Sequence, residues 1–105
     1  MFEELRGKRI LITGASRGIG AAVARKLGEC GAHVGVHYFS SEAPAREVAE
    51  AIRDAGGQAF LIQGDVSQST KAAEVVDEAV AAMGGLDVLI NNAGDMLGRV
   101  SLESM

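Results

Sequence analysis

Hydrophobic and polar residues follow two patterns that alternate along this chain. Short, nearly continuous apolar runs are typical of strands covered on both faces, and they predict strands over residues 9–13, 32–38, 58–63 and 86–90. Between these runs, apolar residues recur every three or four positions, which is the period of a helix with one buried side. This second pattern predicts helices over residues 18–30, 41–55 and 67–83.

The ends and buried faces of these helices can also be predicted from the sequence. Ser41 and Ser67 stand where N-caps are expected, and glycines at 31, 56–57 and 84–85 stand where helices end. The expected buried positions are Ile19, Val23 and Leu27 in the first helix, Val48 and Ile52 in the second, and Ala72, Val75, Val76, Ala79, Val80 and Met83 in the third.

Strands that alternate with helices through short loops require right-handed crossovers and a parallel sheet. The sequence therefore predicts a single α/β domain over residues 1–105, a Rossmann-like three-layer αβα fold with the order βαβαβαβ and the spatial strand order 3-2-1-4. Its crevice is expected between the first and fourth strands. After Gly94 the pattern weakens into a loop over 95–100 and one helical turn over 101–105, so the domain is expected to be incomplete.

Composition and charge narrow the classes of partner. The 105 residues carry a formal net charge of −4, which disfavours a general affinity for nucleic acid or an anionic membrane. The only cysteine, Cys30, has no second thiol to pair with, as is usual in a reducing cytoplasm. The N-terminal segment carries acids where a signal peptide has bases, and no run reaches the roughly 20 apolar residues of a membrane span. We therefore expect a soluble, cytoplasmic protein.

The most informative segment is the glycine-rich turn Thr13-Gly14-Ala15-Ser16-Arg17-Gly18-Ile19-Gly20, between the first strand and the first helix. Gly14 permits a tight turn, Gly18 lets a pyrophosphate approach the backbone, and Gly20 lets the helix pack closely on the sheet. The helix N-terminus that follows favours an anion. The segment predicts a dinucleotide site, with an ordinary strand-to-helix turn as the alternative.

The kind of dinucleotide is expected to be decided after the second strand. NAD-binding folds place an acid about 20 residues beyond the turn, where it holds the ribose hydroxyls. Here the first acid is Glu42, which falls in the next helix. Arg17 inside the turn can grip a phosphate through charge-assisted hydrogen bonds. We therefore expect NADP(H) to be favoured over NAD(H), unless Arg17 is only a solvated loop residue.

Three motifs together resemble the short-chain dehydrogenase/reductase family, particularly NADP-dependent members such as the 3-oxoacyl-acyl-carrier-protein reductases. They are the turn at 13–20, Gly-Asp-Val at 64–66 and Asn-Asn-Ala-Gly at 91–94. The resemblance implies cofactor-binding roles for Gly14, Ser16, Arg17, Gly18 and Ile19 at the phosphates, Asp65 and Val66 at the adenine, and Asn91, Ala93 and Gly94 along the adenosine ribose.

The chain departs from that family at its catalytic centre. Members use a Tyr-x-x-x-Lys pair in which the lysine lowers the pKa of the tyrosine that transfers the proton. The only tyrosine here is Tyr38, and Glu42 follows four residues later. We therefore expect no catalytic residue and no turnover in this chain, which would be the cofactor-binding part of an enzyme that transfers hydride between nicotinamide and a carbonyl or alcohol.

Four alternatives stay open at this point. Asp65 could be only a turn or capping residue, and Asn91 and Asn92 could only tie off the fourth strand. The chain could also be a non-catalytic nucleotide-binding or interaction module that self-associates, as a dimer or higher, through the exposed edge of the fourth strand and the apolar surfaces that the incomplete domain leaves uncovered. A Rossmann-like methyltransferase ranks last, since such folds usually place an acid after the second strand.

Overall fold

A four-stranded parallel sheet with helices on both faces forms the centre of the molecule. The computed structural model describes residues 2–92, and its sheet has the order β3-β2-β1-β4. The strands are β1 (Arg9–Ile12), β2 (His33–Tyr38), β3 (Gln58–Gln63) and β4 (Val88–Ile90), joined by the helices α1 (Gly18–Glu29), α2 (Glu42–Asp54) and α3 (Ser69–Met83). The predicted fold class, strand order and element order are confirmed.

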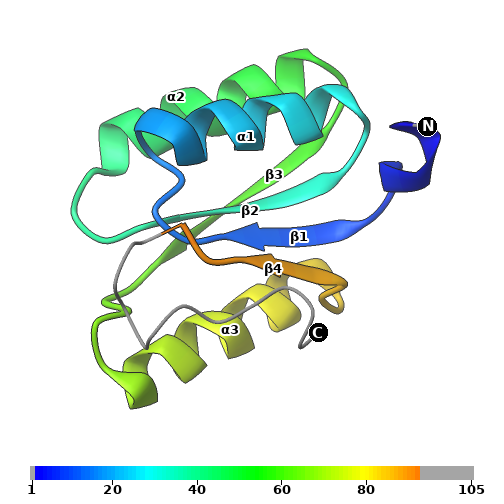
Figure 1. Cartoon of the computed structure of the whole chain (residues 1–105). Coiled ribbons are helices and arrows are strands. Elements are labelled where there is room, and N and C mark those ends of the chain that lie inside the picture. Colours follow the sequence, from blue (N-terminus) through cyan, green and yellow to red (C-terminus); the bar gives the residue numbers. More distant parts are fainter. Residues whose placement is uncertain (1, 93–105) are drawn as a thin grey trace.

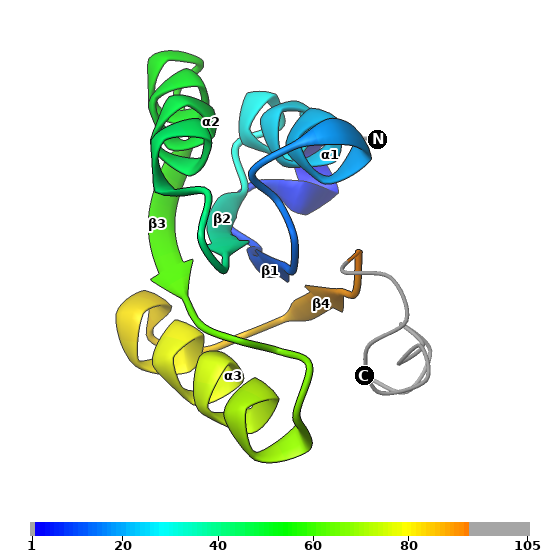
Figure 2. The same cartoon turned by 90° about the vertical axis from the view of Figure 1, so that its left-hand side faces the viewer.

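The distribution of helices follows from the strand order. The chain steps from β1 to β2 to β3 in one direction through α1 and α2, and then returns past β1 to β4 through α3. Because parallel crossovers are right-handed, reversing the direction moves the connecting helix to the other face of the sheet. Figures 1 and 2 show α1 and α2 on one face and α3 on the opposite face. The point of reversal lies between β1 and β4, next to the glycine-rich turn.

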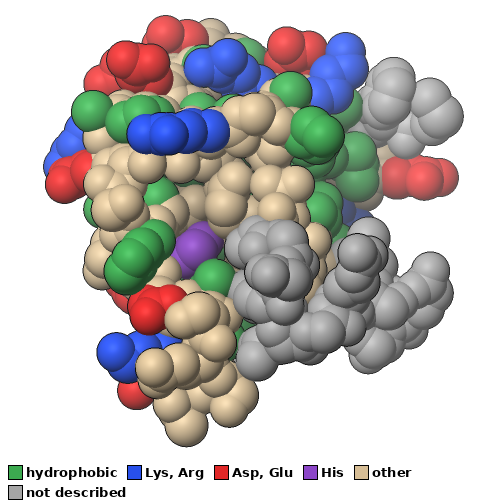
Figure 3. Space-filling model, turned by 60° about the vertical axis from the view of Figure 1, so that its left-hand side comes forward, with side chains coloured by type: hydrophobic (Ala, Val, Ile, Leu, Met, Phe, Trp, Pro, Cys, Tyr) green, Lys and Arg blue, Asp and Glu red, His purple; other side chains and the backbone are tan. Residues whose placement is uncertain are grey.

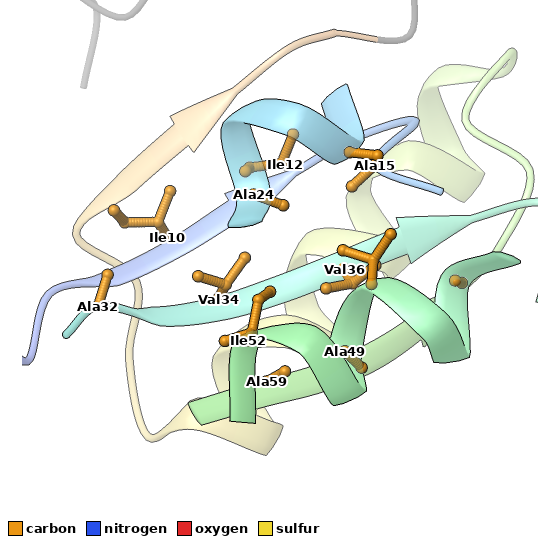
Figure 4. Close-up of a cluster of buried hydrophobic side chains, with 13 residues drawn as sticks. Ile10, Ile12, Ala15, Ala24, Ala32, Val34, Val36, Ala49, Ile52 and Ala59 are labelled. Carbon is orange, nitrogen blue, oxygen red and sulfur yellow. The ribbon is translucent and has the colours of Figure 1, made fainter. Parts of the chain in front are cut away.

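The two faces of the sheet have separate hydrophobic cores because successive side chains on a strand point to opposite sides. Ile10 and Ile12 pack with Val34, Val36 and Ile52 in the core beneath α1 and α2 (Figure 4). Leu11 lies in the other core, with α3. That second core consists of Leu11, Ile62, Val66, Ala72, Val75, Ala79 and Met83.

The predicted buried face of α1 is wrong at its first turn. Ile19 is 77% exposed, whereas the buried positions are Gly20, Ala21, Ala24 and Gly28. Small residues occupy these positions because α1 packs very close to its neighbours. A Cβ on Gly28 would lie only 2.6 Å from Cγ2 of Ile52 on α2.

Several smaller predictions also fail. Val80 is exposed on α3. Ser41 is the N-cap of α2 as predicted, but its side chain forms no capping hydrogen bond, and Ser67 is not the N-cap of α3. The N-cap of α3 is Gln68. A 3-10 helix at Phe2–Leu5 was not expected. The predictions for residues 95–105 lie outside the described residues.

Arg9 and Asp87 join β1 to the α3–β4 loop at the amino edge of the sheet. Arg9 donates from its backbone N–H and its Nε to Asp87 Oδ2, at 2.8 and 3.0 Å, and its Nη1 donates to the Gly84 carbonyl at 3.0 Å. The hydrogen bonds from Arg9 lower the pKa of Asp87 from 3.8 to about 2. The ionised carboxylate is therefore favoured in the folded state.

We expect Asp87→Asn to destabilise the chain near neutral pH and to have no further effect in strong acid. A lowered carboxylate pKa stabilises the fold above the unfolded value of 3.8, and this contribution disappears as the pH falls toward about 2. Denaturant unfolding at several pH values measures it, with Glu42→Gln at the exposed Glu42–Arg46 pair as the control. Equal losses of stability at all pH values would contradict this account.

Candidate functional site

The glycine-rich turn lies where β1 ends and α1 begins, at the carboxyl edge of the sheet. Gly14 has φ 64° and Gly18 has φ 57°, in the left-handed region that glycine adopts without strain. Ser16 is half-buried, whereas Arg17, Gly18 and Ile19 are exposed. The turn therefore presents its backbone and the Arg17 side chain to solvent.

No side chain caps the first turn of α1. Arg17 is the N-cap, forms no capping side-chain hydrogen bond, and no acid is present in the first turn. The N–H groups of a first turn have no partner within the helix, and the helix dipole adds positive potential there. This end of α1 is therefore suited to an anion, as the sequence predicts.

Gly20 fixes how closely α1 approaches the strand ends. A Cβ at this position would collide with the Asn92 side-chain nitrogen and would lie 2.5 Å from the Gly14 carbonyl oxygen. Asn92 Nδ2 donates to that same carbonyl at 3.0 Å. Close packing, predicted for Gly20, is confirmed, and the contact is with the turn and the end of β4.

Thr13 connects the end of β1 to the residues after β4. Its hydroxyl donates to Asn91 Oδ1 at 3.2 Å and accepts from the Asn92 backbone N–H at 3.0 Å. Asn91 Nδ2 is buried and has no hydrogen-bond partner within residues 2–92. Asn91 and Asn92 therefore do tie off this strand, and the Asn91 side-chain NH₂ group donates to no group among the described residues. Ala93 and Gly94 lie outside the described residues.

His37 is a site residue that the sequence analysis missed. It is 2% exposed near the end of β2. Its Nδ1 accepts from the Gly14 backbone N–H at 2.9 Å, and its Nε2 lies 2.8 Å from the Gly64 carbonyl oxygen. Figure 3 shows one histidine side chain, in purple, close to hydrophobic side chains, in green, on the face that it displays. A histidine at a buried position of an apolar strand was the available signal.

The two hydrogen bonds fix the protonation of the His37 ring. Because a backbone N–H only donates, Nδ1 must be unprotonated, and the ring proton lies on Nε2, which donates to Gly64. Burial lowers the pKa of His37, although the Gly64 carbonyl partly opposes the change. The folded state therefore binds this proton less well than the unfolded chain, so stability falls as the pH drops below about 6.5.

The β3–α3 loop forms a tight turn around Asp65. Asp65 Oδ1 accepts from the Ser67 backbone N–H at 2.9 Å and from its hydroxyl at 2.7 Å. These bonds lower the pKa of Asp65. The Ser67 hydroxyl thus donates to Asp65 within the loop. It does not form the helix cap that the sequence predicts, because a local side-chain hydrogen bond competes with the cap. Val66 is buried against α3.

A cavity of 340 Å³ lies beside this loop, lined in part by Phe39, Gln63, Gly64, Asp65, Lys71 and Val75. Phe39 is 59% exposed, and Gln63 Nε2 donates to its carbonyl at 2.8 Å. The glycine-rich turn, the β3–α3 loop and the end of β4 therefore lie together at the carboxyl edge of the sheet. Tyr38 ends β2 and Glu42 begins α2 on this edge, so the Tyr-x-x-x-Lys pattern is not formed there.

Comparison with protein families gives a match over almost the whole chain. The family described as short chain dehydrogenase matches residues 8–104. An uncharacterised oxidoreductase of Methylorubrum extorquens is 53% identical over 93 residues, which are 89% of this chain and 38% of that protein. The 3beta-hydroxysteroid dehydrogenase 1 of Eggerthella lenta is 44% identical over 90% of this chain and 36% of its own length.

Solved structures of a reductase and a putative dehydrogenase are also similar to this chain. The NADH-dependent reductase A1-R' complexed with NAD superposes with a TM-score of 0.84 at 40% identity, covering 100% of this chain and 43% of that one. A putative dehydrogenase from Burkholderia cenocepacia with bound NADP superposes with a TM-score of 0.79 at 37% identity, covering 83% and 34%. The chain thus spans well under half the length of these proteins. Within residues 2–92, no helix is long and apolar enough to cross a membrane.

Proposed function

This chain belongs to the short-chain dehydrogenase family, and from that premise we propose that it is the NADP(H)-binding part of an oxidoreductase that transfers hydride between nicotinamide and a carbonyl or alcohol. We also propose that, within this family, the chain is most similar to the NADP-dependent 3-oxoacyl-acyl-carrier-protein reductases. The family membership leaves the methyltransferase alternative without support.

The observation that carries this proposal is the uncapped start of α1 behind a glycine turn. Gly18 has open space around its missing Cβ, and neither a capping side chain nor an acid occupies the first turn. A pyrophosphate can therefore approach the backbone N–H groups near Ser16, Gly18 and Ile19. Gly14 lines the same site and shapes it, since its N–H and carbonyl are bonded to His37 and Asn92.

The cavity beside the β3–α3 loop supports placing the adenosine end of the dinucleotide at this loop. Phe39 offers an exposed aromatic face, and Asp65 keeps one carboxylate oxygen outside its bonds to Ser67. An ionised carboxylate accepts hydrogen bonds only, which suits the amino group of adenine. Val66 follows Asp65 in the chain, and we assign its backbone to the adenine as well. Asn91, whose side-chain NH₂ group donates to no group among the described residues, leads toward Ala93 and Gly94, which we assign to the ribose.

The preference for NADP(H) rests on Tyr38 and Arg17. Tyr38 ends β2, where an NAD-binding fold carries an acid, and the exposed Arg17 starts α1 next to the phosphate site. A guanidinium can bind a 2′-phosphate with two parallel hydrogen bonds. Of the two solved relatives described above, one holds NADP and the other NAD, so the preference depends on this chain's own residues.

Calorimetric titration of the chain tests the proposal directly. We expect saturable binding of NADPH, weaker binding of NADH and no binding of S-adenosylmethionine. We also expect no reduction of a ketone, because the Tyr-x-x-x-Lys pair does not occur in these 105 residues. Absence of binding to both dinucleotides would contradict the proposal, and substantial turnover would contradict the assignment of catalysis to residues outside this chain.

The edge of β4 supports a second role in self-association. Val88, Leu89 and Ile90 are all half-buried, and within residues 2–92 this strand pairs only with β1. An unpaired strand edge recruits another strand. Light scattering on the titration samples decides this point, since a dimer supports the role and a monomer at high concentration removes it.

A further inference from the structure

We infer that His37 is a positioning residue that holds the glycine-rich turn and the β3–α3 loop at the separation a dinucleotide requires, and that protonation of its ring breaks the bond to the turn, so that cofactor binding weakens in acid. The inference rests on the proposed function, because the two loops it joins are the ones assigned to the pyrophosphate and the adenine. It assigns His37 no contact with the cofactor and no part in catalysis.

The geometry makes His37 a direct link between the two loops. One ring nitrogen accepts from Gly14 in the turn, and the other donates to Gly64 at the start of the β3–α3 loop. The backbone reinforces the arrangement, since the His37 carbonyl accepts from the Ala15 N–H at 2.9 Å and the Tyr38 carbonyl accepts from the Gly64 N–H at 3.1 Å. The ring therefore acts as a spacer of fixed length.

Protonation affects only one of the two side-chain bonds. A doubly protonated ring still donates to Gly64, but its Nδ1–H faces the Gly14 N–H, and two donors repel each other. The Gly14 amide then has no acceptor in a half-buried position, which is costly. Because Gly14 opens the turn, losing this bond frees the segment that leads into the start of α1.

The strand that carries this ring and the two segments that it links also carry charged or titratable side chains. The turn carries the exposed Arg17, β2 carries Tyr38, and the β3–α3 loop carries Asp65, whose Oδ1 is bonded to Ser67. The pKa of His37 is lowered by burial and partly raised again by the hydrogen bond to the Gly64 carbonyl, and neither cause involves a charged side chain. The ring is therefore neutral near pH 7 and becomes charged only in acid.

Two substitutions at His37 separate the bond from the titration. His37→Asn can place a carboxamide oxygen near the position of Nδ1, which keeps an acceptor for Gly14 but does not titrate in this range. His37→Phe keeps an aromatic ring and removes both hydrogen bonds. His33→Asn is the matched control, since His33 is the other histidine, lies half-buried at the start of β2, and is remote from both loops.

The experiment measures dissociation constants for NADP⁺ from about pH 8 to about pH 5.5. We expect binding by the unmodified chain and by His33→Asn to weaken about tenfold more over this range than binding by His37→Asn. The 2′-phosphate itself titrates near pH 6, but it does so equally in every variant. His37→Phe is expected to bind about tenfold more weakly than the unmodified chain at about pH 8.

Nitrogen NMR on the unmodified chain gives an independent result that needs no variant to fold. We expect an unprotonated Nδ1 and a protonated Nε2 at neutral pH, with the Gly14 amide signal titrating together with the His37 ring. The opposite tautomer, or a Gly14 signal that ignores the ring, would overturn the inference. So would identical pH profiles for the unmodified chain and His37→Asn, even though cofactor binding itself would then stand. No binding by any form at about pH 8 would instead overturn the proposed function, and this inference with it.

Discussion

Replacing Gly20 with valine is expected to abolish measurable cofactor binding and to lower the free energy of unfolding by about 3 kcal/mol. A Cβ at this position would collide with the Asn92 side-chain nitrogen and the Gly14 carbonyl oxygen. These two groups are hydrogen-bonded to each other, so the new side chain would separate them. Because the clash involves backbone on one side, α1 must move outward, and its N-terminus would leave the phosphate site.

Ala22→Val provides a matched control for the Gly20 substitution. Ala22 is exposed on the same helix, so the change introduces the same β-branched side chain without a clash. Its cost is the lower helix propensity of valine, about 0.6 kcal/mol, and cofactor affinity is expected to stay unchanged. Denaturant unfolding and calorimetric titration measure both quantities. Equal losses for the two variants would show that the close approach at Gly20 does not matter.

Replacing Arg17 with glutamine is expected to weaken NADPH binding about 10- to 30-fold while leaving NADH binding within about twofold. The guanidinium is exposed at the start of α1, where it can reach a 2′-phosphate that only NADPH carries. A charge-assisted hydrogen bond contributes about 1.5–3 kcal/mol, and the lower part of this range corresponds to the expected change. Binding constants for both cofactors, measured in the same buffer, provide the result.

Two further variants make the specificity test stringent. Arg25→Gln removes an exposed arginine farther along α1, so it changes the net charge equally and is expected to have no selective effect. Tyr38→Asp places an acid at the end of β2, which should repel the 2′-phosphate and shift the preference toward NADH. If Arg17→Gln weakened both cofactors equally, Arg17 would contact a shared part of the dinucleotide and the preference for NADP(H) would lose its main support.

Much of the fold could be predicted because its signals are local. The apolar runs defined the strands to within two residues at each end, and glycines ended the helices as expected. Gly31 has φ 87° directly after the α1 C-cap, and Gly84 is the α3 C-cap with φ 79°. The strand order followed from the usual arrangement of Rossmann-like folds, which needs no knowledge of side-chain contacts.

The errors arose where two segments compete for the same space or the same hydrogen bond. Ile19 fits the helical period of a buried face, yet Gly20 and Ala21 occupy that side because α1 lies too close to the turn for a large side chain. Ser67 fits the pattern of a cap, yet its hydroxyl bonds to Asp65, two residues away. In both cases the local pattern was compatible with more than one arrangement.

By itself, the sequence determined the alternation of strands and helices, the position of the glycine turn and the three motifs of the family, because each depends on residues that are neighbours along the chain. Only the tertiary structure decided that His37, Gly14 and Gly64 form one hydrogen-bonded link, and that Thr13, Asn91 and Asn92 form another. These groups come from different strand ends that meet only when the parallel sheet forms. A periodic pattern records which side of an element is buried, but it does not record which groups share the same space.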